Sequence, residues 1–164
     1  MDTNESLTIQ SAAAIPAGAN HLFPVFLKLE QMRLLIVGGG PVGLEKLQAV
    51  LSNSPHTNIT LVAETILDDI HALAQKHTNI TLIKKSFADS DLEAIEVAII
   101  AVNNKPLSAA IYKMAKDRQV LVNVADTPDL CDFYLSSVVQ KGNIKIAIST
   151  NGKSPTLAKR LKES

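Results

Sequence analysis

The segment RLLIVGGGPVG at residues 33–43 joins a short apolar run to a cluster of glycines. After Arg33 the run is entirely apolar, which is typical of a parallel strand covered on both faces. Pro41 then stands where the first turn of a helix favours proline, and apolar residues recur at roughly helical spacing as far as Asn53. The segment therefore predicts a strand, a glycine turn and a helix in direct succession.

The glycines of this turn match the G-x-G-x-x-G pattern of dinucleotide-binding proteins. In that pattern the first glycine permits a tight turn, the second lets a pyrophosphate approach the backbone, and the third lets helix and strand pack closely. Free N–H groups at the helix start also attract the anion. An ordinary tight turn is the weaker alternative, because strand, helix and spacing all agree. The cofactor is therefore expected on Gly38, Gly39, Gly40, Pro41, Val42 and Gly43.

Glu64 is the acidic residue expected about 20 positions further on, at the end of a strand predicted over residues 58–63. Its carboxylate can accept hydrogen bonds from an adenosine ribose, and no arginine lies beside it to hold a 2′-phosphate. The pattern thus favours NAD over NADP. The alternative is a solvated glutamate that caps the next helix.

Strands and helices alternate over the first three quarters of the chain. Further strands are predicted at residues 79–83, 96–102 and 120–124, helices at residues 66–76 and 106–118, and a helical turn at residues 89–95. Strands joined by helical crossovers run parallel in right-handed units. The fold class is therefore α/β, with a doubly wound parallel sheet of the Rossmann type.

The pattern changes after residue 126. Two strands are predicted at residues 133–140 and 144–150, with one apolar face and a tight turn between them, followed by a helix that starts at Ser154. We expect this helix to pack against something beyond Ser164. The predicted organisation is a flexible tail (residues 1–20), an NAD-binding domain (residues 21–126), and a small β-rich dimerisation and substrate segment (residues 127–164).

Ligands of an open parallel sheet bind beyond the carboxyl ends of its strands, which singles out three loops. Asn103 follows one predicted strand and is assigned to the cofactor. Asp126 follows another, where its carboxylate can take a proton as hydride leaves a substrate; the start of an Asp-Thr-Pro turn is an equally weighted alternative. Substrate contacts are assigned to the loop formed by Thr150, Asn151, Gly152 and Lys153, whose alternative role is a plain connection.

Composition excludes several classes of function. Lys plus Arg equals Asp plus Glu at 16 each, and only six residues are aromatic, so nucleic acid is not an expected partner. No apolar run reaches the roughly 20 residues that span a bilayer. The single cysteine, Cys131, fits a reducing cytoplasm, and the four histidines show no metal-binding spacing. We therefore expect a cytoplasmic protein with no membrane segment and no resident metal.

Four segments carry a resemblance to a known family. They are NHLFPVF (residues 20–26), LIVGGGPVGLEK (residues 35–46), VNVADTPDLCDF (residues 122–133) and IAISTNGKSPTL (residues 146–157). In this order and spacing they resemble the precorrin-2 dehydrogenase/sirohydrochlorin ferrochelatase family, the dehydrogenase domain of sirohaem synthases. The last two segments are far more specific than a glycine turn alone.

The resemblance implies NAD-dependent oxidation of precorrin-2, a carboxylate-rich tetrapyrrole, to sirohydrochlorin in sirohaem biosynthesis. Some members also insert iron, and the resemblance leaves that activity open. The family's essential aspartate maps onto Asp126, its serine or threonine near substrate and cofactor maps onto Thr150, and its members are typically homodimers. The competing hypothesis is a regulatory module that binds NAD without performing chemistry.

The sequence departs from the family pattern at several positions. Glu45 stands where arginine is usual, Asn103 belongs to a Val-Asn pair that replaces Thr-Asp, and Asn151 replaces glycine. The first two changes put a basic role and a cofactor-contacting hydroxyl in doubt. The family's C-terminal helical region would follow Ser164, so the resemblance leaves open whether residues 1–164 form the full tetrapyrrole pocket and the complete dimer.

Overall fold

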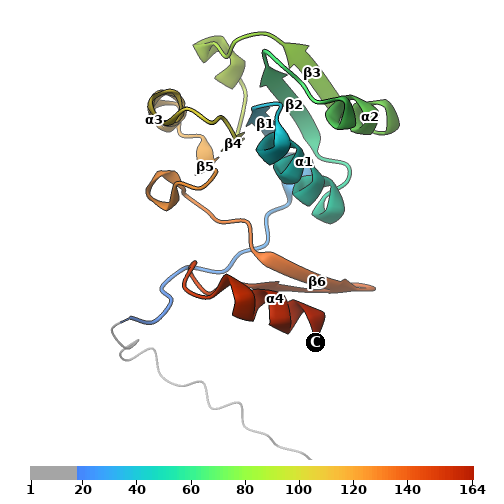
Figure 1. Ribbon diagram of the computed structural model, residues 1–164, viewed down its shortest axis with the longest axis vertical. Helices are drawn as coiled ribbons and strands as arrows, with labels where there is room; N and C mark the ends of the chain where they lie inside the picture. The colour runs from blue at the N-terminus through green and yellow to red at the C-terminus, as the bar shows by residue number, and fades with distance from the viewer. Residues whose placement is uncertain (1–17) are drawn as a thin grey trace, which may run out of the picture. The chain divides into compact units, whose positions relative to one another are not determined.

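The structure is a computed structural model that describes residues 18–164 (Figure 1). Most of the predicted N-terminal tail therefore lies outside the described residues. The chain divides into two compact units, a larger one over Leu27–Leu135 and a smaller one that combines residues 18–26 with Ser136–Ser164.

The larger unit alternates strands with helices. Its strands are β1 (Arg33–Val37), β2 (Asn58–Ala63), β3 (Ile80–Lys84), β4 (Val97–Ile100) and β5 (Leu121–Val124). Its helices are α1 (Pro41–Asn53), α2 (Asp68–Lys76) and α3 (Lys105–Asp117), with short 3-10 turns η1 (Leu29–Gln31), η2 (Asp89–Leu92) and η3 (Pro128–Leu130). The five strands are parallel in the order β3-β2-β1-β4-β5. The predicted doubly wound Rossmann-type sheet is confirmed.

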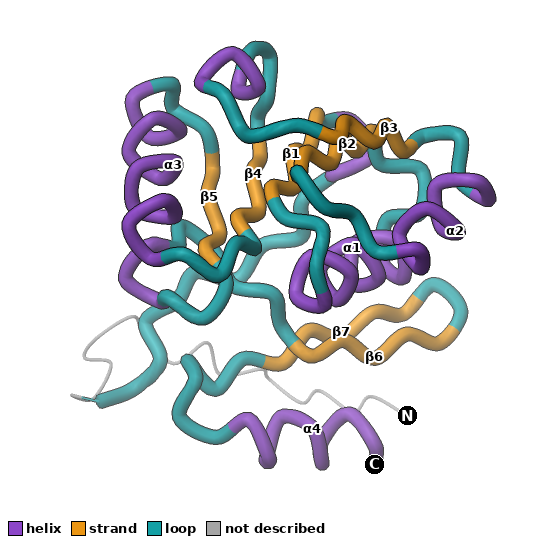
Figure 2. Tube along the Cα trace, turned by 45° about the horizontal axis from the view of Figure 1, so that its top comes forward, coloured by secondary structure: helices purple, strands orange, loops and turns teal. Residues whose placement is uncertain are grey.

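The central strand β1 is buried on both faces, which explains its unbroken apolar sequence. Leu34 and Ile36 belong to a core cluster with residues of α1 and α2, whereas Leu35 and Val37 belong to a second cluster with residues of α3. Figure 2 shows α3 on one side of the sheet and α1 and α2 on the other. Burying each such side chain stabilises the fold by about 1.5–3 kcal/mol.

The strand order reverses direction at β1. From β1 the chain proceeds outward to β2 and β3, then returns to place β4 against the other edge of β1. The loops that leave β1 and β4 therefore run towards opposite faces of the sheet, and a crevice opens between them at the carboxyl ends of the strands. This is where the glycine turn lies.

The strands predicted to end at residues 102 and 150 end at Ile100 and Ile148, and two other elements begin later than predicted for identifiable reasons. Helix α2 begins at Asp68 and not at residue 66, because the Leu67 N–H donates to the Gly39 carbonyl (2.9 Å) and ties that residue to the glycine turn. The strand predicted from residue 133 begins only at Ser137. Phe133 packs instead against the core of the larger unit, and its carbonyl accepts a hydrogen bond from the Asn123 side chain (2.9 Å).

The smaller unit contains β6 (Ser137–Lys141) and β7 (Ile144–Ile148), which pair antiparallel, and helix α4 (Pro155–Glu163). Gly142 in the hairpin turn has φ +57°, and the Ser154 hydroxyl caps α4 by accepting from the Leu157 N–H (3.3 Å). The predicted hairpin and helix are therefore present. Within residues 18–164, no helix is long and apolar enough to cross a membrane.

Candidate dinucleotide-binding and active site

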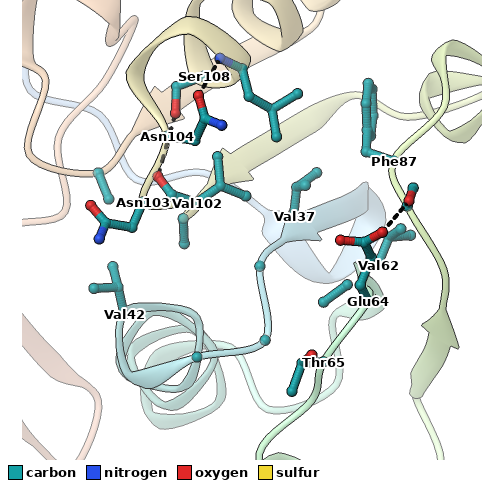
Figure 3. Close-up of a pocket in the computed structure, with 18 of the residues that line it drawn as sticks. Val37, Val42, Val62, Glu64, Thr65, Phe87, Val102, Asn103, Asn104 and Ser108 are labelled. Carbon is teal, nitrogen blue, oxygen red and sulfur yellow. Dashed lines mark hydrogen bonds between the residues drawn. The ribbon is translucent and has the colours of Figure 1, made fainter.

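A cleft of about 910 Å³ opens at the carboxyl ends of the parallel strands, a volume in the usual range for small-molecule and cofactor sites. Its lining comes entirely from the larger unit and includes the loops that follow all five strands (Figure 3). Seven of the eight residues predicted to bind the cofactor line this cleft, and Gly43 is the exception. Asp126 also lines the cleft.

The glycine turn is shaped by close backbone contacts. Gly38 has φ +128°, and a Cβ at this position would collide with the Ala101 carbonyl group at the end of β4. A Cβ on Gly43 would collide with the Gly38 carbonyl, so this glycine lets α1 pack closely on the turn. Gly40 differs, because a Cβ there would meet no atom within 4 Å. The open face at Gly40 provides the close approach to backbone that a pyrophosphate requires.

Helix α1 begins at the same turn. Its N-cap is Gly40, which has no side chain to cap the first N–H groups, and its first turn contains no acidic residue. These N–H groups have no intrahelical acceptor, and the helix dipole adds partial positive charge at this end. The turn thus suits the diphosphate of a dinucleotide in shape and in charge.

Glu64 follows β2 at the edge of the cleft. One of its carboxylate oxygens, Oε1, accepts a hydrogen bond from the Ser86 hydroxyl (2.5 Å), drawn as a dashed line in Figure 3. No residue of the described chain donates to the other oxygen, Oε2, which leaves it available for a ribose hydroxyl. The alternative of a helix cap receives no support, because Glu64 makes no hydrogen bond to α2 and the N-cap Leu67 has no side-chain bond.

The loop after β4 carries two asparagines with different roles. The Asn104 side chain caps α3 by accepting from the Leu107 N–H (3.0 Å), so it is committed to the helix start. Asn103 is exposed on the cleft and makes no side-chain hydrogen bond within the described residues. Asn103 is therefore free to contact a ligand.

Asp126 follows β5 and adopts a left-handed backbone conformation, with φ +58°. Aspartate tolerates this region better than most residues, at a cost on the order of 1 kcal/mol. The turn is closed by the backbone, since the Thr127 N–H donates to the Val124 carbonyl (3.2 Å). Within the described chain no group donates to the Asp126 carboxylate, whereas an aspartate that starts a turn normally accepts such a bond. This observation favours a chemical role over the turn-forming role.

Cys131 and Asp132, two residues near this loop, have structural roles. The Cys131 thiol lies near two carbonyl oxygens, those of Val124 (3.2 Å) and Thr127 (3.3 Å). Burial raises the pKa of this thiol, which disfavours the nucleophilic thiolate. The Asp132 carboxylate accepts from Lys116 (2.7 Å) and from the Val122 N–H (2.9 Å), and so holds α3 against β5.

The four residues assigned to the substrate belong to the smaller unit and form its turn between β7 and α4. The Thr150 hydroxyl oxygen accepts from the Ser154 N–H (3.1 Å), and its carbonyl accepts from the Lys153 N–H (3.1 Å). Asn151 and Gly152 have φ +55° and +75°. The turn is therefore well defined by its own backbone.

No sequence pattern singles out Lys85 or Ser86. Both line the cleft after β3. The rule that singled out the loops after other strands applies equally to this loop, but neither residue belongs to a recognisable motif. Within residues 18–164 there is no group of three or more His, Cys, Asp or Glu side chains able to hold a metal ion.

A parallel doubly wound sheet with this glycine turn defines a dinucleotide-binding domain. Comparison with protein-family models agrees: residues 25–137 match the family described as "Putative NAD(P)-binding", and residues 141–164 match the one described as "Sirohaem biosynthesis protein central". The chain belongs to the first of these families, whose model covers more than half of it. The predicted family resemblance and the predicted class of cofactor are both confirmed.

Named relatives point in the same direction. The chain is 34% identical over 140 residues to a siroheme synthase of Thioalkalivibrio sulfidiphilus, covering 85% of this chain and 28% of the relative. It is 39% identical over 142 residues to a siroheme synthase of Psychrobacter cryohalolentis, covering 85% and 26%. The chain thus spans less than a third of the length of these enzymes.

One solved structure is similar in fold and sequence. It is that of SirC, a precorrin-2 dehydrogenase, with a TM-score of 0.69 and 28% sequence identity. The match covers 87% of this chain and 68% of SirC. The similarity therefore extends over both units of the chain.

Proposed function

We propose that this chain catalyses the NAD-dependent dehydrogenation of precorrin-2 to sirohydrochlorin in sirohaem synthesis. The observation that carries the proposal is that one cleft has a lining that combines the glycine turn, Glu64 and Asp126. The similarity to SirC and to siroheme synthases supplies the substrate. The Glu64 carboxylate, which follows β2 where a ribose diol binds, favours NAD over NADP.

The chemistry removes two hydrogens from the substrate, one as hydride and one as a proton. When bound, NAD⁺ supplies the hydride acceptor. The glycine turn binds the diphosphate and Glu64 binds the adenosine ribose, which fixes the cofactor along the cleft. Asp126 accepts the proton at its carboxylate and, being exposed, returns it to solvent. This role requires that the carboxylate be ionised when substrate binds.

The loop between β7 and α4 is proposed to contact the substrate. Thr150, Asn151, Gly152 and Lys153 offer a hydroxyl, an amide, exposed backbone and an ammonium group. The ammonium group of Lys153 complements the carboxylates of a tetrapyrrole. Precorrin-2 is thus the small-molecule partner, and the protein is expected in the cytoplasm.

We also propose that the protein forms a homodimer through the smaller unit. The side chains of Ile144 and Ile146 in the hairpin and of Leu157 and Leu161 on α4 are 66%, 52%, 49% and 50% exposed. Large apolar side chains exposed to this degree on a small unit are typical of an interface with another chain. A second copy of this chain is the occupant that we propose.

The decisive test is formation of NADH from NAD⁺ and precorrin-2, measured by NADH absorbance. Asp126→Asn should lower turnover by about two to four orders of magnitude while NAD⁺ affinity changes less than about twofold. The matched control is Asp129→Asn, which removes an exposed carboxylate three residues further on that does not line the cleft. A wild-type protein that binds NAD⁺ but forms no NADH would support the regulatory-module hypothesis instead.

A further inference from the structure

The end of the cleft at Glu64, where the adenosine ribose is proposed to bind, contains a lysine whose charge is paired with a carboxylate. Lys85 follows β3 as Glu64 follows β2, and the preceding residues, Lys84 and Ala63, are paired in the parallel sheet. The Lys85 N–H donates to the Ala63 carbonyl (3.0 Å), so the two loops leave the sheet side by side. Two lysines line the cleft. Lys105 is the first residue of α3 and follows β4, so Lys85 is the positively charged lining residue near Glu64.

The Lys85 ammonium group donates to the Asp91 carboxylate at 2.6 Å and to the Ser86 carbonyl at 3.3 Å. The Asp91 side chain is only 10% exposed, and its same oxygen accepts from the Ala88 N–H at 2.8 Å. Asp91 is therefore fixed at the start of η2. A carboxylate held in this way draws the flexible lysine into one position.

We infer that Asp91 is a specificity-determining positioning residue, which holds the Lys85 charge so that it cannot neutralise the 2′-phosphate of NADP. The inference rests on the proposed function, because it assumes that the adenosine ribose binds at Glu64. The two carboxylates and one ammonium at this end leave a net negative charge. A 2′-phosphate carries nearly two further negative charges at neutral pH and is repelled there, whereas the uncharged 2′-hydroxyl of NAD is not.

Glu64 and Asp91 thus exclude NADP by different routes. Glu64 acts directly, with an oxygen available to a ribose hydroxyl and repulsive to a phosphate. Asp91 acts through Lys85. If the Lys85 ammonium group were not paired with Asp91, it would be well placed to attract a phosphate. Ser86 supports the first route, since its hydroxyl donates to Glu64 and fixes that carboxylate.

The test compares NAD⁺ with NADP⁺, and 5′-ADP with 2′,5′-ADP, by calorimetric titration of the whole chain. Asp91→Asn keeps an oxygen that can accept from the Ala88 N–H but removes the charge that holds Lys85. We expect this variant to bind NADP⁺ and 2′,5′-ADP about tenfold more tightly than wild type, with affinity for NAD⁺ and 5′-ADP within about twofold. The gain should shrink at high salt, as a partly exposed charge interaction does.

The matched control is Asp89→Asn, which removes a neighbouring carboxylate of η2 that pairs with Arg118 (2.6 Å) and does not line the cleft. This control should leave the ratio of the NADP⁺ and NAD⁺ affinities unchanged. Adding Lys85→Gln to Asp91→Asn should erase the gain for NADP⁺. An unchanged ratio in Asp91→Asn, or an equal loss of affinity for both dinucleotides, would overturn the inference.

A second variant keeps the inference open to refutation if Asp91→Asn does not fold. Lys85→Gln alone leaves the Asp91 charge unpaired and should weaken NADP⁺ binding only moderately, by about threefold, because Lys85 does not contact the phosphate in the wild-type protein. A large loss would mean that Lys85 contacts the phosphate in the wild-type protein, and the inference would be wrong. If wild type binds neither dinucleotide, the proposed function fails, and this outcome is distinct from an unchanged ratio.

Discussion

The two units of this chain bury their apolar side chains to very different degrees. In the larger unit the strands of the parallel sheet are covered on both faces, and residues such as Leu34 and Leu35 are fully buried. Among the described residues of the smaller unit, Ala158 is the only hydrophobic residue that is buried, and Ile144 and Ile146 remain more than half exposed. The smaller unit also has a lower proportion of Val, Ile and Leu than the larger unit.

This difference in burial indicates that the two units have different roles. The larger unit has a core on both faces of its sheet and contains all of the cleft-lining residues. The smaller unit has two strands and one helix, and several of its isoleucine and leucine side chains remain about half exposed or more. Its stability is therefore expected to depend on other surfaces, and its role to lie in assembly and substrate binding.

The largest expected contrast comes from matched isoleucine truncations. Ile36→Ala in β1 should lower the free energy of unfolding by about 2–5 kcal/mol, because it leaves a cavity in a closed core. Ile146→Ala in β7, at a side chain 52% exposed, should change it by less than about 0.5 kcal/mol in dilute solution. Urea unfolding followed by circular dichroism measures both. Equal losses in the two variants would contradict the contrast between the units.

A smaller contrast lies within the glycine turn. Gly38→Ala should destabilise the fold by about 1–3 kcal/mol, since the new methyl group meets the Ala101 backbone and the residue has positive φ. Gly40→Ala should leave stability within about 0.5 kcal/mol, because that methyl group enters open space. It should still weaken NAD⁺ binding, measured by titration, by obstructing the diphosphate. Unchanged NAD⁺ affinity in Gly40→Ala would argue against binding at this turn.

The exposed face of the smaller unit provides a third test. Ile146→Lys should shift the protein towards the monomer, because a charge at the proposed interface must be desolvated when two copies associate. Sedimentation velocity at several concentrations would detect the shift. The unfolding of the larger unit should be unaffected. If Ile146→Lys associates as strongly as wild type, the homodimer does not use this face.

Most of the fold was predictable from local patterns. The bounds of β1, α1 and β2 agree with the sequence prediction because the signals that set them are local: an unbroken apolar run, a proline at the helix start, and Ser54-Pro55 directly after the helix. The strand expected from residue 133 was wrong for a long-range reason. Phe133 is apolar in either setting, and only the contact between its carbonyl and Asn123 reveals that it closes the larger unit.

The candidate site was predictable in part for the same reason. Gly38, Glu64 and Asp126 follow strands at positions where known patterns place ligands, so spacing alone singled them out. The Lys85–Asp91 pair belongs to no pattern, since it depends on the conformation of the loop between β3 and η2. The left-handed conformation of Asp126 was also not predictable, because aspartate adopts several turn conformations.

The smallest expected effect tests how far the packing of the larger unit continues beyond β5. Burial raises the pKa of the Cys131 thiol, with a further contribution from the negative charge of Asp132. A thiol pKa that is higher in the folded than in the unfolded chain stabilises the fold below the unfolded pKa. That contribution is lost as pH rises through the folded value.

We therefore expect unfolding free energy to fall slightly faster above about pH 8.5 in wild type than in Cys131→Ala, by less than about 1 kcal/mol because the group is partly exposed. Parallel urea titrations at neutral and alkaline pH would measure the difference. The thiol should also react slowly with an alkylating reagent at neutral pH, and faster after unfolding in urea. Equal reaction rates in the folded and unfolded protein would mean that the packing of the larger unit ends before Cys131, and that the loop after Asp126 lacks the support that a proton-accepting carboxylate requires.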